Sequence, residues 1–62
     1  MKPIVDIFEK LPDGSPMWVE AVEGLDKARA RVKELSQRAP ADYFIYSKQN
    51  GKIHREDYPQ NQ

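Results

Sequence analysis

Side chains that carry out acid–base chemistry are few in this chain of 62 residues. Asp6 and Glu20 lie in two segments predicted to pair as a hairpin, so their carboxylates are candidates for a close pair. A catalytic carboxyl group needs a concave pocket that perturbs its pKa, and a chain this short leaves little room for one. His54 is the only histidine, and neither Ser15 nor Ser47 has an evident base as partner.

Sequence motifs for cofactors and metals are equally scarce. The chain has no glycine-rich phosphate loop, no nucleophile motif and no metal-ligand spacing. With no cysteine and one histidine, a structural zinc site is excluded as an interpretation. We therefore expect no catalytic, cofactor-binding or metal-binding residues and no cofactor, and we predict that the protein is not an enzyme.

The charges of the chain balance overall but are unevenly distributed. Ten basic and ten acidic residues cancel, so no global field steers the protein to nucleic acid or to a membrane. Residues 1–23 hold two basic and five acidic residues, whereas residues 24–39 hold five basic and two acidic ones. The simpler interpretation of the basic segment is a solvated helix face, and the alternative is a site for a polyanion.

One segment has the periodicity of an amphipathic helix. Its apolar residues follow one another at steps of three and four and therefore form one stripe: Leu25, Ala28, Val32, Leu35 and Ala39. This stripe predicts a helix over residues 25–39. Asp26 near its start and Arg38 near its end suit the helix dipole, and Pro40 ends it.

Four short segments rich in β-branched and aromatic residues are predicted to be strands, at residues 4–10, 17–22, 42–47 and 52–55. Proline, aspartate and glycine at 12–14 form the first turn, and Asn50-Gly51 forms the last. The predicted fold is α+β: a four-stranded antiparallel sheet in a ββαββ chain, strand order 2-1-3-4, with one helix on one face. Order 1-2-3-4, with one parallel pair, is the alternative. We expect one domain over residues 1–58 and a frayed tail at 59–62.

The length of the last hairpin loop decides which face of the sheet carries Ile53. A two-residue loop places Ile53 with Phe44 and Tyr46, whereas a three-residue loop, Gln49-Asn50-Gly51, places it with Ile45. We prefer the three-residue loop because Ile53 then joins the β-branched residues beneath the helix. The residues predicted to face the helix are Val5, Ile7, Val19, Ala21, Tyr43, Ile45 and Ile53.

The face that the helix leaves bare is the candidate interaction face. Its aromatic residues are Phe8, Trp18, Phe44 and Tyr46. Ile4 and Val22 are expected beside them, with charged residues around the edge: Asp6, Lys10, Glu20, Lys48 and Arg55. One helix cannot cover both faces of a sheet, and a large exposed apolar patch usually marks an interaction surface.

Three interpretations of this face compete. In the first, the aromatic residues pair across strands beneath the stems of charged side chains. In the second, the face binds protein, either a second copy in a homodimer or an unknown partner. In the third, it stacks the bases of single-stranded nucleic acid. Asp6 and Glu20 would repel phosphate from that face, and the basic residues sit mostly on the helix, so nucleic acid is disfavoured.

Nothing in the sequence predicts a membrane segment. Apolar runs such as Met17-Trp18-Val19 are only a few residues long, whereas a membrane-spanning helix needs about 20 apolar residues. The N-terminal residues lack the apolar region of a signal peptide. We expect a cytoplasmic protein.

The order of turn and packing signals resembles small bacterial domains of unknown function. The resemblance covers about residues 4–55 and is carried by four features: Pro12-Asp13-Gly14, Trp18-Val19, the helix around Ala28 and Leu35, and Asn50-Gly51-Lys52-Ile53. It implies the ββαββ arrangement. It brings no known catalytic or binding residues to this chain.

Overall fold

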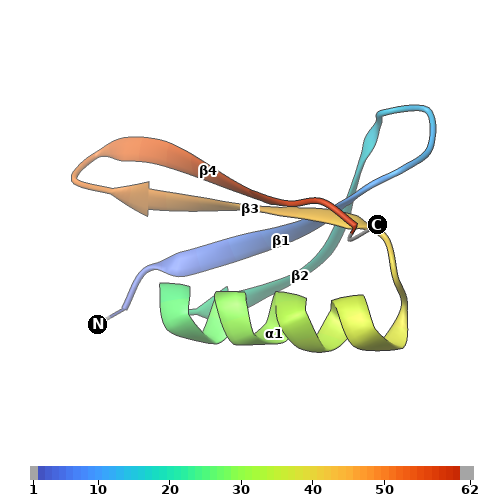
Figure 1. Ribbon diagram of the computed structural model, residues 1–62. Helices are drawn as coiled ribbons and strands as arrows, with labels where there is room; N and C mark the ends of the chain where they lie inside the picture. Colours follow the sequence, from blue (N-terminus) through green and yellow to red (C-terminus); the bar gives the residue numbers. More distant parts are fainter. Residues whose placement is uncertain (1, 61–62) are drawn as a thin grey trace.

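The computed structural model describes residues 2–60 as four strands and one helix (Figure 1). The strands are β1 (Ile4–Lys10), β2 (Pro16–Glu23), β3 (Asp42–Gln49) and β4 (Lys52–Tyr58), and the helix is α1 (Leu25–Arg38). The strands pair antiparallel in the order β2-β1-β3-β4, and α1 packs on one face. The predicted α+β fold, the ββαββ pattern and the strand order are thus confirmed.

Helix α1 begins at Leu25, directly after Gly24, whose φ of 95° is easily adopted by glycine. It ends at Arg38, one residue earlier than predicted. The backbone N–H of Ala39 donates to the carbonyl of Leu35 at 2.7 Å, and the hydroxyl of Tyr43 donates to the carbonyl of Ala39 at 2.7 Å. The end of the helix is therefore tied to the start of β3.

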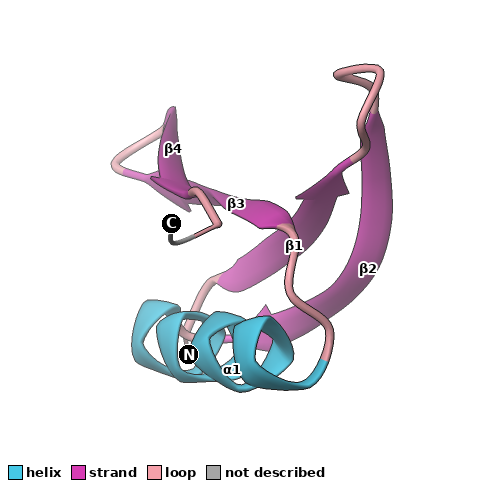
Figure 2. Ribbon diagram, turned by 45° about the vertical axis from the view of Figure 1, so that its right-hand side comes forward, coloured by secondary structure: helices cyan, strands magenta, loops and turns pink. Residues whose placement is uncertain are grey.

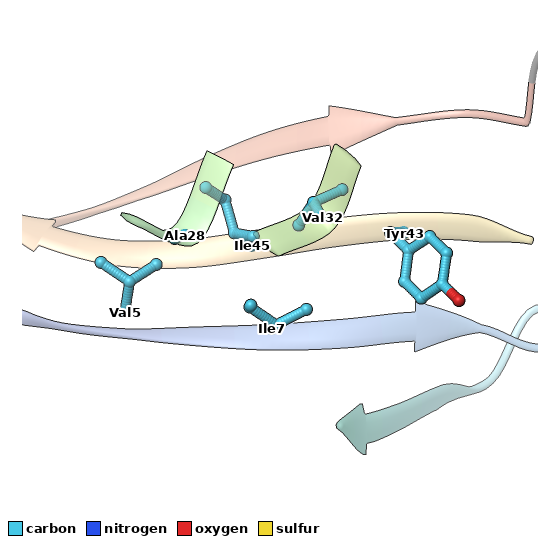
Figure 3. Packing of buried hydrophobic residues seen from close by; sticks show 6 residues of the cluster. All are labelled: Val5, Ile7, Ala28, Val32, Tyr43 and Ile45. Atoms are coloured by element: carbon cyan, nitrogen blue, oxygen red, sulfur yellow. The ribbon is translucent and has the colours of Figure 1, made fainter. Parts of the chain in front are cut away.

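The core lies between α1 and the two central strands (Figure 3). Among residues 2–60, the buried cluster consists of Val5 and Ile7 from β1, Tyr43 and Ile45 from β3, and Ala28 and Val32 from α1. Leu25 and Leu35 pack against it from the same helix face. Small Ala28 lets the helix approach the sheet closely. These helix residues all belong to the apolar stripe that was predicted from the sequence.

Strand β2 contains a β-bulge that the sequence pattern did not reveal. Ile7 pairs with Glu20, but its neighbour Phe8 pairs with Trp18. Val19 is therefore the extra residue, and the alternation of side chains reverses on its far side.

This reversal changes the face of three residues. Val22 lies opposite Val5 and packs against the core, while Glu20 binds Arg31 of α1. Ala21 is exposed and lies opposite a residue of the bare face. The predictions that Ala21 faces the helix, and that Val22 and Glu20 face away from it, are wrong because one inserted residue shifts the period.

The turn between β3 and β4 has two residues, not the three that we preferred. Lys48 pairs with Ile53 and Gln49 with Lys52, which leaves only Asn50 and Gly51 in the loop. Both adopt left-handed backbone angles, with φ of 53° and 78°. Two such residues match the twist of the flanking strands, so no bulge is needed. The prediction that Ile53 lies beneath the helix is therefore wrong: Ile53 is 72% exposed on the other face.

The sheet is strongly twisted, and the tip of the β1–β2 hairpin curls away from α1 (Figure 2). After β4 ends, the backbone N–H of Gln60 donates to Asp42 Oδ1 at 2.6 Å. Of the predicted tail, residues 61–62 lie outside the described residues, as does residue 1 of the predicted domain. Within residues 2–60, no helix is long and apolar enough to cross a membrane.

Candidate interaction surface

Three of the four candidate aromatic residues form one cluster on the face opposite α1. Phe8 lies opposite Phe44 across β1 and β3, and their rings stack with centroids 5.2 Å apart and an interplanar angle of 7°. Tyr46 meets both rings edge-on, each at 5.4 Å. Offset stacks and edge contacts are the favoured aromatic geometries, so the strand register builds this cluster without help from a second layer.

Arg55 of β4 covers the cluster. Its guanidinium carbon lies 4.0 Å above the centre of the Phe44 ring, and its Nε donates to Asp57 Oδ1 at 2.8 Å. The hydrogen bond to Asp57 raises the pKa of Arg55 and also orients its guanidinium over the ring. Phe44 is consequently only 4% exposed and is closed to a partner while Arg55 covers it.

Trp18 lies apart from this cluster. It is 58% exposed and forms no ring stack with the other aromatic residues of the described chain, although it lies opposite Phe8. Its Nε1 approaches Asp6 Oδ1 at 3.4 Å, which is longer than a normal N–H···O bond. Its indole is therefore the accessible aromatic side chain of the candidate face.

A groove lies at the other end of the same face. Ile4 and Ile53 flank it, and they are 58% and 72% exposed. The remaining lining residues are Asp6, Tyr46, Ser47 and Lys48. The groove has a volume of about 580 Å³ and is lined by residues from the start of β1 and from both sides of the β3–β4 turn. These two parts of the chain lie at the same end of the sheet (Figure 1). The preferred three-residue loop wrongly excluded Ile53 from this surface. A two-residue Asn50-Gly51 loop, the alternative considered from the sequence, places Ile53 there.

The charges on the bare face nearly balance. Within residues 2–60, the strand registers place four acidic and three basic side chains there: Asp6, Glu23, Asp42, Asp57, Lys10, Lys48 and Arg55. Glu20, which was expected to repel phosphate from this face, lies on the helix side instead. The loss of Glu20 is offset by Glu23, Asp42 and Asp57, so the face carries no excess of positive charge for a polyanion.

The basic residues of α1 bind the acidic residues of the sheet. Arg31 Nε lies 2.8 Å from Glu20 Oε1, and Arg31 also pairs with Glu34. Arg29 makes two hydrogen bonds to Glu56 of β4, at 3.1 and 3.2 Å. The Arg29 guanidinium holds the pKa of Glu56 below its usual value. Two of the five basic side chains in this segment thus tie the helix to the sheet, which favours the structural interpretation of its charge.

The carboxylates considered for acid–base chemistry do not meet. Asp6 lies opposite Ala21 on the bare face, whereas Glu20 is on the helix side. His54 lies opposite Ser47, a pairing not expected from the sequence. Ser47 is only 5% exposed, and its hydroxyl accepts a hydrogen bond from Gln49 Nε2 at 3.0 Å. This hydroxyl is therefore not presented to a substrate.

Other potential reactive groups have local structural roles. The hydroxyl and backbone N–H of Ser15 both donate to Asp13 in the first turn, at 2.6 and 2.9 Å. These bonds hold the pKa of Asp13 below its usual value. Across the described part of the chain, no group of three or more His, Cys, Asp or Glu residues is placed to hold a metal ion.

The chain matches no family model, no curated protein and no solved structure. The resemblance to small bacterial domains of unknown function stays a prediction.

Proposed function

We propose that this protein is a self-association module in which two copies pack their bare sheet faces together. One observation carries the proposal. Of the four large hydrophobic side chains exposed among residues 2–60, three lie on the face that α1 leaves bare: Ile4, Trp18 and Ile53. The fourth, Met17, lies opposite Glu9 on the other face, near the hairpin tip. Covering the first three would remove apolar surface from water, which is the main driving force of association.

A second copy is the occupant that the charges favour. A twofold interface brings a surface against itself, so the surface must be self-complementary. The bare face carries acidic and basic side chains side by side, as at Lys10 and Asp42. Two copies can therefore pair opposite charges across the interface, whereas a strongly charged partner gains little from a face of nearly balanced charge.

The size of the domain supports the same proposal. A chain of 62 residues has a small core, and this one has no cysteine for a disulfide. Oligomerisation is one of the ways in which such small domains gain stability. We assign the protein no catalytic role and place it in the cytoplasm, where a chain without disulfides is at no disadvantage.

Sedimentation equilibrium over a range of concentrations tests the proposal. We expect the wild-type chain to dimerise. Trp18→Lys and Ile53→Lys each bury an unpaired charge in the interface, so the dissociation constant should rise by at least about tenfold, or roughly 1.4 kcal/mol. Met17→Lys is the matched control, because it adds the same charge to an exposed hydrophobic position on the opposite face.

Two results would refute self-association through this face. One is a wild-type chain that stays monomeric at the highest concentration reached. The other is a Met17→Lys variant that dissociates as readily as Ile53→Lys. Quenching of Trp18 fluorescence by a single-stranded oligonucleotide, weakening as salt is added, would instead support the nucleic-acid interpretation.

A further inference from the structure

We infer that, in the dimer proposed above, the indole of Trp18 inserts into the groove between Ile4 and Ile53 of the second copy. The inference rests on the proposed self-association and specifies how the two faces fit. It makes Trp18 the main contact residue and the groove its binding site.

The positions of the side chain and the groove suit a twofold axis. Trp18 lies opposite Phe8, while Ile4 lies four residues earlier on β1, about 13 Å away along the strand. The backbone of Trp18 and the start of β1 thus lie at different ends of the face, and the indole leans toward Asp6 between them. A twofold axis through the middle of the face exchanges its ends, so each Trp18 reaches the groove of the other copy.

The groove is large and apolar enough for an indole. A cavity of about 150 Å³ is sufficient to bind benzene, and this groove measures about 580 Å³. Ile4 and Ile53 form its walls and Tyr46 contributes an aromatic ring. Trp18 lies on β2 near the hairpin tip, and its side chain is 58% exposed. The tip itself curls away from α1 (Figure 2).

The groove also offers an acceptor for the indole N–H, which needs one when buried. Asp6 lines the groove, and its contact with Trp18 of its own chain is long, at 3.4 Å. The carboxylate can therefore accept a shorter bond from the partner's Trp18. Lys48 lines the same groove and offsets the charge of Asp6.

Intermolecular quenching of fluorescence tests the insertion. Trp18 is the only tryptophan and the chain has no cysteine, so a nitroxide label can be attached at one engineered position. The labelled copy carries Trp18→Phe and Lys48→Cys and is mixed in excess with wild-type protein. All tryptophan emission then comes from the wild-type copy, and we expect the nitroxide to quench most of it. Labels at Lys10→Cys, on the same face beside Trp18, and at Lys33→Cys, on α1, are the controls and should quench far less.

A second measurement covers the case in which the label itself blocks the groove. Wild-type protein is mixed with an unlabelled copy that carries Trp18→Phe and Ile53→Ala. We expect a smaller blue shift of Trp18 emission than with a copy carrying Trp18→Phe and Met17→Ala.

The outcomes separate this inference from the proposal on which it rests. Strongest quenching from position 48, or a blue shift that depends on Ile53, supports insertion. A dimer in which position 10 quenches most, or in which neither measurement responds to the groove, overturns insertion and leaves self-association standing. A chain that does not dimerise overturns both.

Discussion

The two faces of this sheet both carry apolar side chains, but they are covered in different ways. On one face, α1 supplies a second layer, and Ile7 and Ile45 are fully buried beneath it. On the other face no second layer is present within residues 2–60, and Phe44 is buried by its own strand neighbours and by Arg55.

The comparison shows what a sheet can and cannot cover without a second layer. Cross-strand stacking buries a residue at the centre of the face, where neighbours lie on every side. It fails at the ends of the face, where Trp18, Ile4 and Ile53 remain more than half exposed. Their apolar surface adds little to the stability of one copy and is free to stabilise an assembly.

Phe44→Ala tests whether the bare face has a core of its own. Phe44 is 4% exposed, so its truncation should cost about 3–5 kcal/mol, enough to unfold a domain of this size. Trp18→Ala on the same face should change stability by no more than about 0.5 kcal/mol in dilute solution. Urea unfolding followed by circular dichroism measures both. Equal losses for the two variants would erase the distinction between centre and edge.

Isoleucine to alanine substitutions compare the two faces with the side chain held constant. Ile45→Ala should cost about 2–5 kcal/mol, because Ile45 is fully buried under α1. Ile53→Ala, at a position that is 72% exposed, should cost less than about 0.5 kcal/mol in the monomer. The same unfolding experiment applies at low protein concentration. A large loss at Ile53 under those conditions would place it in the core after all.

Gly51→Ala probes the turn that sets the face of Ile53. The φ of Gly51 is 78°, and an added Cβ meets nothing within 4 Å, so the cost is one of backbone strain alone, about 1–2 kcal/mol. Gly14→Ala is the matched control, because it introduces the same kind of backbone strain in the first turn, at a φ of 90° and with equally open surroundings. Nuclear Overhauser contacts between Lys48 and Ile53 should persist in the variant. Unchanged stability would contradict the left-handed turn.

The Glu56–Arg29 pair should give the smallest effect, visible as a dependence on pH. The pKa of Glu56 is lowered in the folded state from its ordinary value of 4.5, mainly by its hydrogen bond to Arg29. Its contribution to stability is therefore present above pH 4.5 and is lost as the pH falls through the lower folded value. Partial exposure keeps the effect small.

Urea unfolding of wild type and Glu56→Gln from neutral to acidic pH measures this contribution. The difference between the two proteins should shrink as the pH falls below 4.5. In an Arg29→Gln background, the same difference should be reduced at neutral pH as well. A difference that is constant with pH would show that the pair adds nothing through its charge.

Most of the fold was readable from the sequence because its signals are local. The apolar steps from Leu25 to Leu35 predicted the helix, and the buried Ala28 and Val32 lie on that stripe. Strand composition and the turn residues gave four strands, and the return path of the helix favoured the order 2-1-3-4, which the structure has. Of the candidate face, the position of Phe8, Phe44 and Tyr46 on one side followed from simple alternation.

The elements, their order and the aromatic centre of the bare face therefore follow from local signals in the chain. The edges of that face depend on how the strands pair. The bulge at Val19 and the two-residue turn at Asn50-Gly51 each decide which side chains of a strand point to which face of the sheet. One residue more or fewer at either place moves every side chain beyond it to the other face. The place of Glu20 depends on the bulge, which the sequence pattern does not reveal, so it became visible only in the folded chain. The place of Ile53 follows from the two-residue form of the Asn50-Gly51 turn, which the sequence left open as an alternative.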